Sequence, residues 1–199
     1  MQEASDLELV RSANGGDDDA FHTLIDRHAG MLFRMAQSLT RNRADAEDLL
    51  QETFVGAYRG LKSFAGRSSV KTWLVQILTR QAAKAWHRSR HSRNTRSIDS
   101  PSGVSTGGDA NGGYHERSLT SPSQTSAVDR RLDVMTVLQT ISPAHREILV
   151  LREIRGLSYE EIAQVLEVPR GTVESRLSRA RAEFREKLTR GEEERKSRS

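Results

Sequence analysis

Apolar residues recur at steps of three and four along two long stretches of the chain, and no stretch alternates convincingly at every second position. The first spacing is typical of amphipathic helices, whereas alternation is typical of strands. In the N-terminal stretch one apolar stripe comprises Leu49, Leu50, Phe54, Ala57, Tyr58 and Leu61, and a second comprises Trp73, Leu74, Ile77, Leu78 and Ala82. The pattern therefore predicts an all-α protein.

The C-terminal stretch adds local signals for where its helices begin and end. Ser142 suits an N-cap, Pro143 suits the first helical turn, and Gly156 suits a helix stop. Ser158 and Glu161 have the spacing of a capping box, in which each side chain accepts a backbone N–H of the other residue. These signals predict one helix from Pro143 to near Gly156 and a short one after Ser158.

Residues 92–127 interrupt this periodicity. They contain 9 Ser, 5 Gly and 4 Thr among 36 positions and almost no large apolar residue. Such a composition cannot bury enough surface to offset the entropy of ordering, so it predicts a flexible linker, which as a coil spans roughly 33 Å. The expected organisation is two small helical domains, at 1–91 and 128–190, followed by a charged tail at 191–199.

Two helices in the C-terminal half are joined by a tight connection at Val168 and Pro169, which indicates a helix-turn-helix. With Val173 and Leu177 facing inward, the outer face of the second helix is polar and basic. In a major groove, Arg pairs with guanine, Glu accepts from cytosine N4, and Ser or Thr serves base edges or phosphates. The candidate DNA-reading residues are Arg170, Thr172, Glu174, Ser175, Arg176, Ser178 and Arg179. A solvated helix in a bundle is the alternative.

Charge is distributed unevenly along the N-terminal half. Residues 1–56 hold 11 acidic and 5 basic residues, whereas residues 57–100 hold 10 basic residues and 1 acidic residue. The acidic part should repel nucleic acid and the basic part should attract it. We therefore expect a protein partner for the acidic part in addition to a nucleic acid.

Within the acidic part, Asp48, Gln51 and Glu52 share one helical face by their spacing. Paired carboxylates can hold a divalent metal or act as acid and base, but no nucleophile or histidine stands at a matching position nearby. A simple solvated acidic face is the other interpretation. We expect no catalytic residue and no cofactor.

Within the basic part, Arg80, Lys84 and Arg88 repeat every four residues and form a ridge suited to a nucleic-acid backbone. His87 and His91 have the spacing of zinc ligands on a helix, but Arg88 and the other cations disfavour a metal, so no metal site is expected. The chain has no cysteine, no signal-like N-terminus and no apolar run near membrane-spanning length. These features predict a protein of the cytoplasm without membrane insertion.

Three blocks of the sequence, taken in order, resemble bacterial sigma-70 family factors of the extracytoplasmic function (ECF) group. They are "DAEDLLQETFVGAYRGLKSF", "KTWLVQILTRQAAKAW" and "LSYEEIAQVLEVPRGTVESRLSRAR", with the linker before the last. The resemblance covers roughly residues 18–90 and 128–188. It implies a sigma-2 domain and a sigma-4 domain, and a non-enzymatic function: binding core RNA polymerase and directing it to promoters with defined −10 and −35 elements.

The resemblance also assigns roles to residues. It implies that Asp48, Gln51, Glu52 and Tyr58 dock on the clamp helices of the polymerase β′ subunit, with the β flap as a second polymerase contact. It implies that the loop residues Ser63, Gly66, Arg67, Ser68 and Ser69 capture a flipped base of the −10 element, and that Lys71, Arg80, Lys84 and Arg88 hold the opened strand. The helix at 170–185 corresponds to the reader of the −35 element, and an anti-sigma factor is a further candidate partner.

Two rival functions remain at this stage. A stand-alone helix-turn-helix regulator would use residues 1–90 as a sensor or dimerisation domain and would bind its operator without polymerase. A metal-dependent nucleic-acid enzyme would lose its activity on addition of a chelator.

Overall fold

The computed structural model describes residues 4–96 and 134–196, except for the side chains of 89–96, 192 and 194–196. The regular elements in this described part are all helices, as the apolar spacing predicts. Most of the expected linker at 92–127 lies outside the described residues, and 92–96 belong to a helix. In the described ranges, no helix combines the length and the apolar character needed to cross a membrane.

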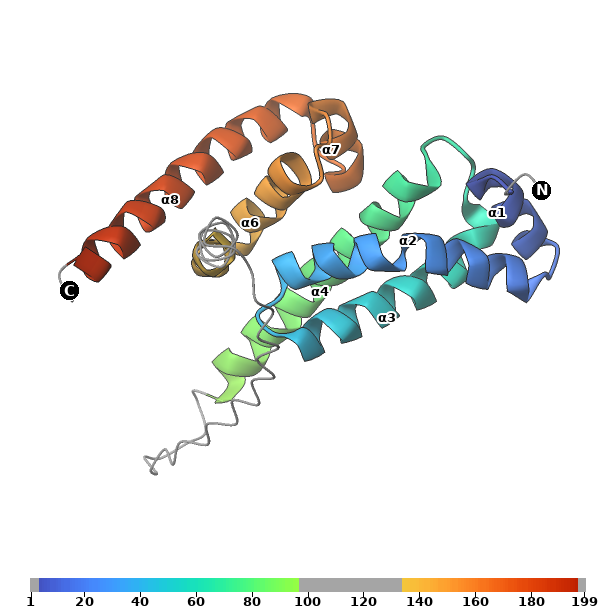
Figure 1. Cartoon of the computed structure of the whole chain (residues 1–199), viewed down its shortest axis with the longest axis horizontal. Helices are drawn as coiled ribbons and strands as arrows, with labels where there is room; N and C mark the ends of the chain where they lie inside the picture. Colours follow the sequence, from blue (N-terminus) through green and yellow to red (C-terminus); the bar gives the residue numbers. More distant parts are fainter. Residues whose placement is uncertain (1–3, 97–133, 197–199) are drawn as a thin grey trace, which may run out of the picture.

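The N-terminal region comprises α1 (Asp6–Asn14), α2 (Asp18–Leu39), α3 (Arg43–Gly60), the short 3-10 helix η1 (Leu61–Ser63) and α4 (Val70–Arg96). Helices α2, α3 and α4 pack against one another in a bundle, and α1 covers one end of it (Figure 1). Side chains that meet in its centre are fully buried: Leu24, Leu32, Met35, Leu74 and Leu78. Truncating one of them to Ala would cost about 2–5 kcal/mol.

Local chemistry explains where these helices begin. Ser5 and Glu8 form a capping box at α1, and the side chains of Asp17 and Asn42 accept backbone N–H groups at the starts of α2 and α3. Ser69 does the same at α4, where its Oγ accepts the Thr72 N–H at 3.0 Å. Each cap satisfies a donor that the first helical turn leaves without a partner.

Helices α3 and α4 approach closely at Gly56. A Cβ atom at this position would lie 2.9 Å from Ile77 Cγ2 and 3.3 Å from Gln81 Nε2. Real Cβ atoms essentially never come within 3.0 Å of another heavy atom, so this close packing of α3 and α4 depends on a residue without a side chain. The close contact sets the distance between the surfaces that α3 and α4 present to solvent.

The C-terminal region comprises a helix at 134–140, α6 (Pro143–Leu149), its π-helical continuation η2 (Val150–Ile154), α7 (Tyr159–Leu166) and α8 (Arg170–Lys196). Gly156, with φ 68°, follows the end of η2, and Ser158 and Glu161 form the predicted capping box at the start of α7. Ser142 occupies the predicted N-cap position, but its side chain does not cap: Ser142 Oγ donates to Glu183 at 3.2 Å. The helix starts are therefore where the sequence places them.

The two regions lie against each other, which the sequence does not predict. Helix α7 packs on α4, and α6 and η2 contact α2 (Figure 1). Buried apolar residues of both regions consequently belong to one contiguous cluster. One residue of the first apolar stripe is placed differently: Tyr58 is 57% exposed, and its ring forms a T-shaped pair with Phe21 at a centroid distance of 5.1 Å.

Candidate polymerase and nucleic-acid interfaces

The exposed face of α3 carries the predicted acidic constellation. Asp48, Gln51 and Glu52 are all exposed, while Leu49 and Thr53 on the opposite side are buried. The structure adds Val55, which is 44% exposed and follows Gln51 and Glu52 by four and three residues. Sequence reasoning missed Val55, although helical spacing alone could have found it. With Tyr58 the face therefore joins carboxylates to an apolar patch, a combination that suits a protein partner.

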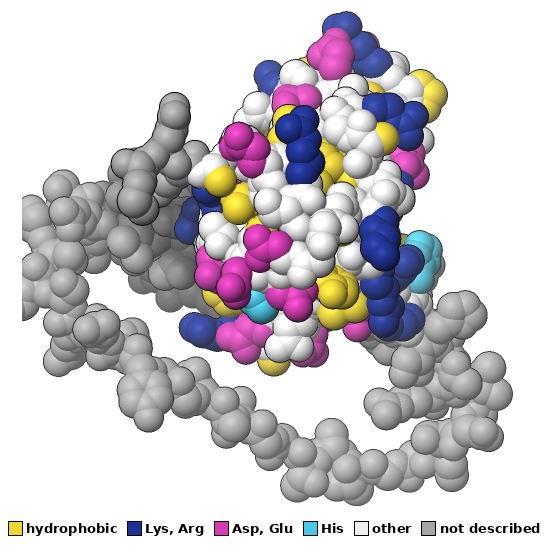
Figure 2. Space-filling model, turned by 90° about the vertical axis from the view of Figure 1, so that its right-hand side faces the viewer, with side chains coloured by type: hydrophobic (Ala, Val, Ile, Leu, Met, Phe, Trp, Pro, Cys, Tyr) yellow, Lys and Arg dark blue, Asp and Glu magenta, His cyan; other side chains and the backbone are white. Residues whose placement is uncertain are grey.

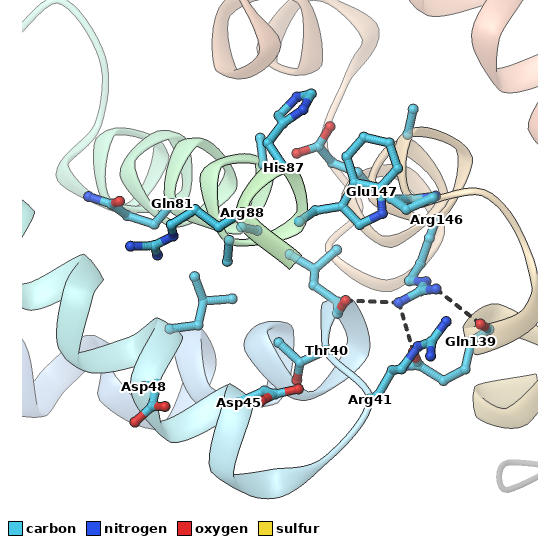
Figure 3. Close-up of a pocket in the computed structure, with 18 of the residues that line it drawn as sticks. Thr40, Arg41, Asp45, Asp48, Gln81, His87, Arg88, Gln139, Arg146 and Glu147 are labelled. Carbon is cyan, nitrogen blue, oxygen red and sulfur yellow. Dashed lines mark hydrogen bonds between the residues drawn. The ribbon is translucent and has the colours of Figure 1, made fainter. Parts of the chain in front are cut away.

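Two of the three polar residues on this face of α3 line a cleft, and the third does not. Asp48 and Glu52 line a cleft of about 850 Å³ between α3, α4 and α6, whereas Gln51 does not line it. Figure 3 shows the cleft with Asp45 and Asp48 on α3 and with Arg146 and Glu147 opposite them on α6. The described residues contain no group of three or more His, Asp or Glu side chains placed to hold a metal ion.

The loop at 64–69 is anchored at both ends and exposed between them. Phe64 packs on Trp73 with ring centroids 4.8 Å apart, and Ser69 caps α4. Ser63 donates its hydroxyl to Gly60 O at 2.8 Å. Between the anchors, Gly66 has φ 67° and is exposed together with Arg67, while Ser68 is half-buried. Two of the five predicted loop residues, Ser63 and Ser69, thus also form hydrogen bonds with the backbone that hold the ends of the loop.

The basic ridge lies along the exposed side of α4. Lys71, Arg80, Lys84 and Arg88 are all exposed, and the neighbouring aliphatic residues Leu74, Val75 and Leu78 are buried. Of these cations Arg80 has an acidic partner, Glu167, which lies in the C-terminal region. Figure 2 shows a column of basic side chains at one side of the molecule and acidic side chains gathered on the neighbouring surface. On this part of the surface the two charge signs are thus separated.

Helices α7 and α8 form the predicted helix-turn-helix. Ile162 and Val165 of α7 and Val173 and Leu177 of α8 are buried against each other and the rest of the region. The turn residue Glu167 adopts a left-handed conformation with φ 54°, which sequence reasoning missed. A buried inner face on two short-linked helices leaves the polar side of α8 outward, where a groove of DNA can meet it.

The predicted reading residues of α8 are not equally accessible. Five of them are exposed and two are half-buried, Thr172 and Arg176. Arg170 lies between two carboxylates, at 2.7 Å from Glu160 Oε1 and 3.0 Å from Glu174 Oε1. The exposed residues are Arg170, Glu174, Ser175, Ser178 and Arg179.

Arg176 is half-buried, and its positive charge acts on Glu147, a half-buried acid of α6. Burial raises the pKa of Glu147 to about 7, and the positive charge of Arg176 opposes part of that rise. Glu147 is on α6 and also lines the cleft. Sequence reasoning missed Glu147 because nothing in the spacing of α6 distinguishes it from a solvated acid.

Arg146, beside Glu147, is 6% exposed and holds four backbone or amide oxygens. Its Nη1 donates to Leu39 O at 2.9 Å and to Gln139 Oε1 at 2.7 Å, and its Nη2 donates to Gln139 O at 3.1 Å and Ile141 O at 3.4 Å. Burial, together with the nearby charge of Arg41, lowers the pKa of Arg146. Because Leu39 ends α2, this side chain ties α6 to the N-terminal region.

The fold is that of a two-part helical protein with a helix-turn-helix in its C-terminal region. Two family models match the chain, sigma-70 region 2 over residues 24–92 and sigma-70 region 4 over residues 131–184. The ECF RNA polymerase sigma-E factor of Haemophilus influenzae is 32% identical over 191 residues, which are 94% of this chain and 97% of that protein. The RNA polymerase sigma-H factor of Pseudomonas aeruginosa is 32% identical over 91% of this chain and 92% of that protein.

Solved structures agree with the sequence relatives. CnrH in complex with the cytosolic domain of CnrY matches with a TM-score of 0.62 at 26% identity, over 94% of this chain and 98% of that one. The sigma factor RpoE in complex with the anti-sigma factor NepR from Bartonella quintana matches with a TM-score of 0.61 at 25% identity, over 85% of this chain and 96% of that one. The chain belongs to the sigma-70 family of RNA polymerase sigma factors, in the ECF group, and is an alternative sigma factor.

Membership of the sigma-70 family distinguishes the sigma-factor function from the two rival functions, a stand-alone regulator and a nucleic-acid enzyme. The N-terminal region is matched by region 2 of the family, so it is not the sensor domain of a stand-alone helix-turn-helix regulator. The match of both regions, in the order of the sequence blocks, also favours a transcription initiation factor over a nucleic-acid enzyme.

Proposed function

We propose that the chain divides promoter recognition among three of its surfaces, acting in the cytoplasm and leaving catalysis to the polymerase. The α3 face would bind the clamp helices of the β′ subunit, and region 4 would meet the β flap. The loop at 64–69 and the α4 ridge would bind the −10 element, and α8 would read the −35 element. The single observation that carries this proposal is the separation of an acidic, partly apolar face on α3 from cationic surfaces on α4 and α8.

Charge and exposure support the assignment of α3 to a protein partner. Asp48 and Glu52 would repel phosphates, so they suit a basic protein surface, and the exposed Val55 and Tyr58 supply apolar area. Aromatic anchors surrounded by polar groups are typical of the centres of protein interfaces.

The −10 assignment is supported by a loop that is exposed between two anchors. An extruded base needs a fixed pocket, because unstacking costs a few kcal/mol that contacts must recover. The Phe64–Trp73 contact and the Ser69 cap hold the ends of the loop, while Gly66 and Arg67 remain open to solvent. Lys71, Lys84 and Arg88 then extend a positive surface along which a single strand can run.

The −35 assignment is supported by the exposed polar side of α8. Glu174, Ser175 and Ser178 carry acceptors or donors that suit base edges, and Arg179 is placed for a phosphate or a guanine. The ion pairs of Arg170 limit its conformations before DNA binds, which reduces the entropy lost on binding.

We also propose regulation by an anti-sigma factor. The solved relative RpoE is bound to one, NepR. The cleft of about 850 Å³ between α3, α4 and α6 supports the proposal, since an inserted segment there would cover Asp48 and Glu52.

The proposal is tested by run-off transcription with core polymerase on a pooled library of promoter templates, with and without the chain. Replacing Asp48, Gln51 and Glu52 together by Ala should lower affinity for core polymerase about tenfold or more, as loss of interface anchors does. Circular dichroism should show unchanged helicity, because all three side chains are exposed.

A matched control removes two exposed acids from α2, Asp19→Ala with Asp26→Ala, and should keep the parental affinity. Equal affinities of the triple variant and the parent chain for core polymerase would overturn the assignment of α3. Absence of any specific transcript with the parent chain would contradict the wider proposal.

A further inference from the structure

Two residues of α4 form polar contacts with the end of α7 and with the turn that follows it. Gln76 Nε2 donates to Gln164 O at 3.2 Å and to Glu167 Oε1 at 3.2 Å, and Arg80 forms an ion pair with the same carboxylate oxygen. Arg80 is one of the cations of the ridge proposed to hold the −10 strand. In the free chain, region 4 therefore supplies an acid to the DNA-binding surface of region 2.

Glu167 is locally a poor choice for the turn that it occupies. Its φ of 54° is a conformation that costs an L-residue energy and that Gly adopts without that cost. It also places a negative charge at the C-terminus of α7, where the helix dipole disfavours anions. The hydrogen bonds and ion pair described for its carboxylate all lead to α4. The hydrogen bond and ion pair with α4 thus offset both the strained backbone conformation of Glu167 and its unfavourable charge at the end of α7.

A second contact holds the regions together at the far end of α2. Arg146 donates to Leu39 O at 2.9 Å, and Gln139 donates to Ser38 O at 3.5 Å. The partners described for the buried Arg146 guanidinium are carbonyl and amide oxygens. Of these four oxygens Leu39 O alone belongs to the N-terminal region, so separating the regions breaks one hydrogen bond of Arg146 and keeps the other three.

We propose that Glu167 is an intramolecular latch that holds region 4 on α4 and occupies Arg80 until promoter DNA or core polymerase displaces it. This inference rests on the proposed role of α4 in binding the −10 strand. A phosphate and the Glu167 carboxylate compete for the same guanidinium, so latch closure and strand binding exclude each other at Arg80. The pair is exposed on both sides, so it is weak enough to open and is weakened further by salt.

Glu167→Gln tests the latch, because it removes the charge and keeps the shape of the side chain. The chain has no cysteine, so Asp26→Cys and Thr189→Cys provide one spin-label site in each region. Pulsed electron resonance on the parent should give one narrow distance distribution, and Glu167→Gln should broaden it toward longer distances. The control Glu186→Gln changes the charge equally within α8 and should leave the distribution unchanged.

The same variants are then compared for affinity toward a single-stranded −10 oligonucleotide in the absence of polymerase. Glu167→Gln should bind about threefold to fivefold more tightly than the parent, the gain expected from removing one exposed ionic competitor. The exchange of charges, Arg80→Glu with Glu167→Arg, should restore the narrow distance distribution.

The outcomes separate the latch from the function on which it rests. An unchanged distance distribution in Glu167→Gln would overturn the latch. An Arg80→Ala variant that binds the oligonucleotide as tightly as the parent would instead overturn the proposed role of Arg80 in DNA binding, even if the distances respond to Glu167→Gln.

Discussion

The two long helices that carry the proposed DNA contacts, α4 and α8, each have 27 residues but differ in how often their basic side chains are paired with acids. Helix α4 contains no acidic residue, and Lys71, Lys84 and Arg88 lie exposed along it. On α8, three of the arginines are paired with carboxylates: Arg170 with Glu160 and Glu174, Arg181 with Glu153, and Arg190 with Glu186. The hydrogen bond from Arg181 to Glu153 also raises the pKa of Arg181.

The difference follows from the task proposed for each helix. Cations without acidic neighbours attract any polyanion, so α4 supplies affinity that depends little on sequence. Paired arginines attract phosphates less but keep a defined orientation, which favours the reading of base edges. Arg80 is an exception on α4, because Glu167 of region 4 pairs with it.

The largest expected effect concerns Glu147, a half-buried acid of α6 that feels the positive charge of Arg176 on α8. Its pKa is raised by burial from 4.5 to about 7, so the folded state binds its proton more tightly than the unfolded chain does. Stability from this group is complete below about pH 4.5, falls as pH rises toward 7, and is then constant. Denaturant unfolding should show the parent losing at most about 3 kcal/mol across this range relative to Glu147→Gln.

Glu147→Gln is neutral at every pH, so the difference between the two proteins isolates this one group. A difference in the free energy of unfolding that stays constant from pH 4.5 to 7 would show that Glu147 is ionised in the folded state throughout. In that case Glu147 would present a full negative charge to Arg176, as Glu160, Glu153 and Glu186 do to Arg170, Arg181 and Arg190.

The next effect in size concerns base preference at the −35 element. Glu174→Ala should relax the preference for cytosine at one base pair, at a cost of about 1–3 kcal/mol for the preferred base. The substitution also removes one of the two carboxylates that hold Arg170, while Glu160 remains. Transcription from a library randomised at the −35 element measures the preference, with Glu186→Ala, on the distal part of α8, as the control. Parental preferences at every position would mean that Glu174 does not read bases.

Local features of the fold were predictable from the sequence, since they depend on residues close together in the chain. The capping box of Ser158 and Glu161 and the buried positions Val173 and Leu177 are of this kind. The exposed position of Tyr58 was not predictable from its place in the apolar stripe, because helical spacing defines a face but does not say how far the neighbouring helix covers it.

Contacts between the two regions could not be predicted from the spacing of apolar residues. Arg80 and Glu167 are 87 positions apart, and Arg146 and Leu39 are 107 apart. Periodicity tells which side of one helix is apolar, whereas these contacts depend on how two regions fold onto each other. The candidate DNA residues could be listed from the sequence, and helical spacing also offers Glu174 as a partner of Arg170, but the pairing of Arg80 with Glu167 could not be predicted.

A smaller effect is expected from α4. Lys84→Ala with Arg88→Ala should weaken binding to single-stranded DNA about tenfold, whatever the sequence, since phosphate contacts carry no base information. The slope of log affinity against log salt should fall by roughly 1.4, or about 0.7 for each phosphate lost. Fluorescence anisotropy at several salt concentrations measures both quantities. Arg11→Ala with Arg43→Ala removes the same charge elsewhere in the region and should change neither; a loss confined to −10 sequences would contradict the assignment of these residues to the backbone.

The smallest expected effect tests whether pairing on α8 orients side chains rather than stabilising the fold. The pair between Arg170 and Glu160 is exposed on both sides, so a double-mutant cycle on unfolding should give a coupling of only about 0.2–1 kcal/mol. Glu160→Gln should nevertheless broaden the −35 preference, because Arg170 then keeps Glu174 as its one carboxylate partner and samples more orientations. Its salt slope for promoter binding should stay close to the parental value, since no cation is removed. A variant with changed slope and unchanged preference would mean that α8, like α4, uses its cations only as charges, and the distinction between the two helices would be lost.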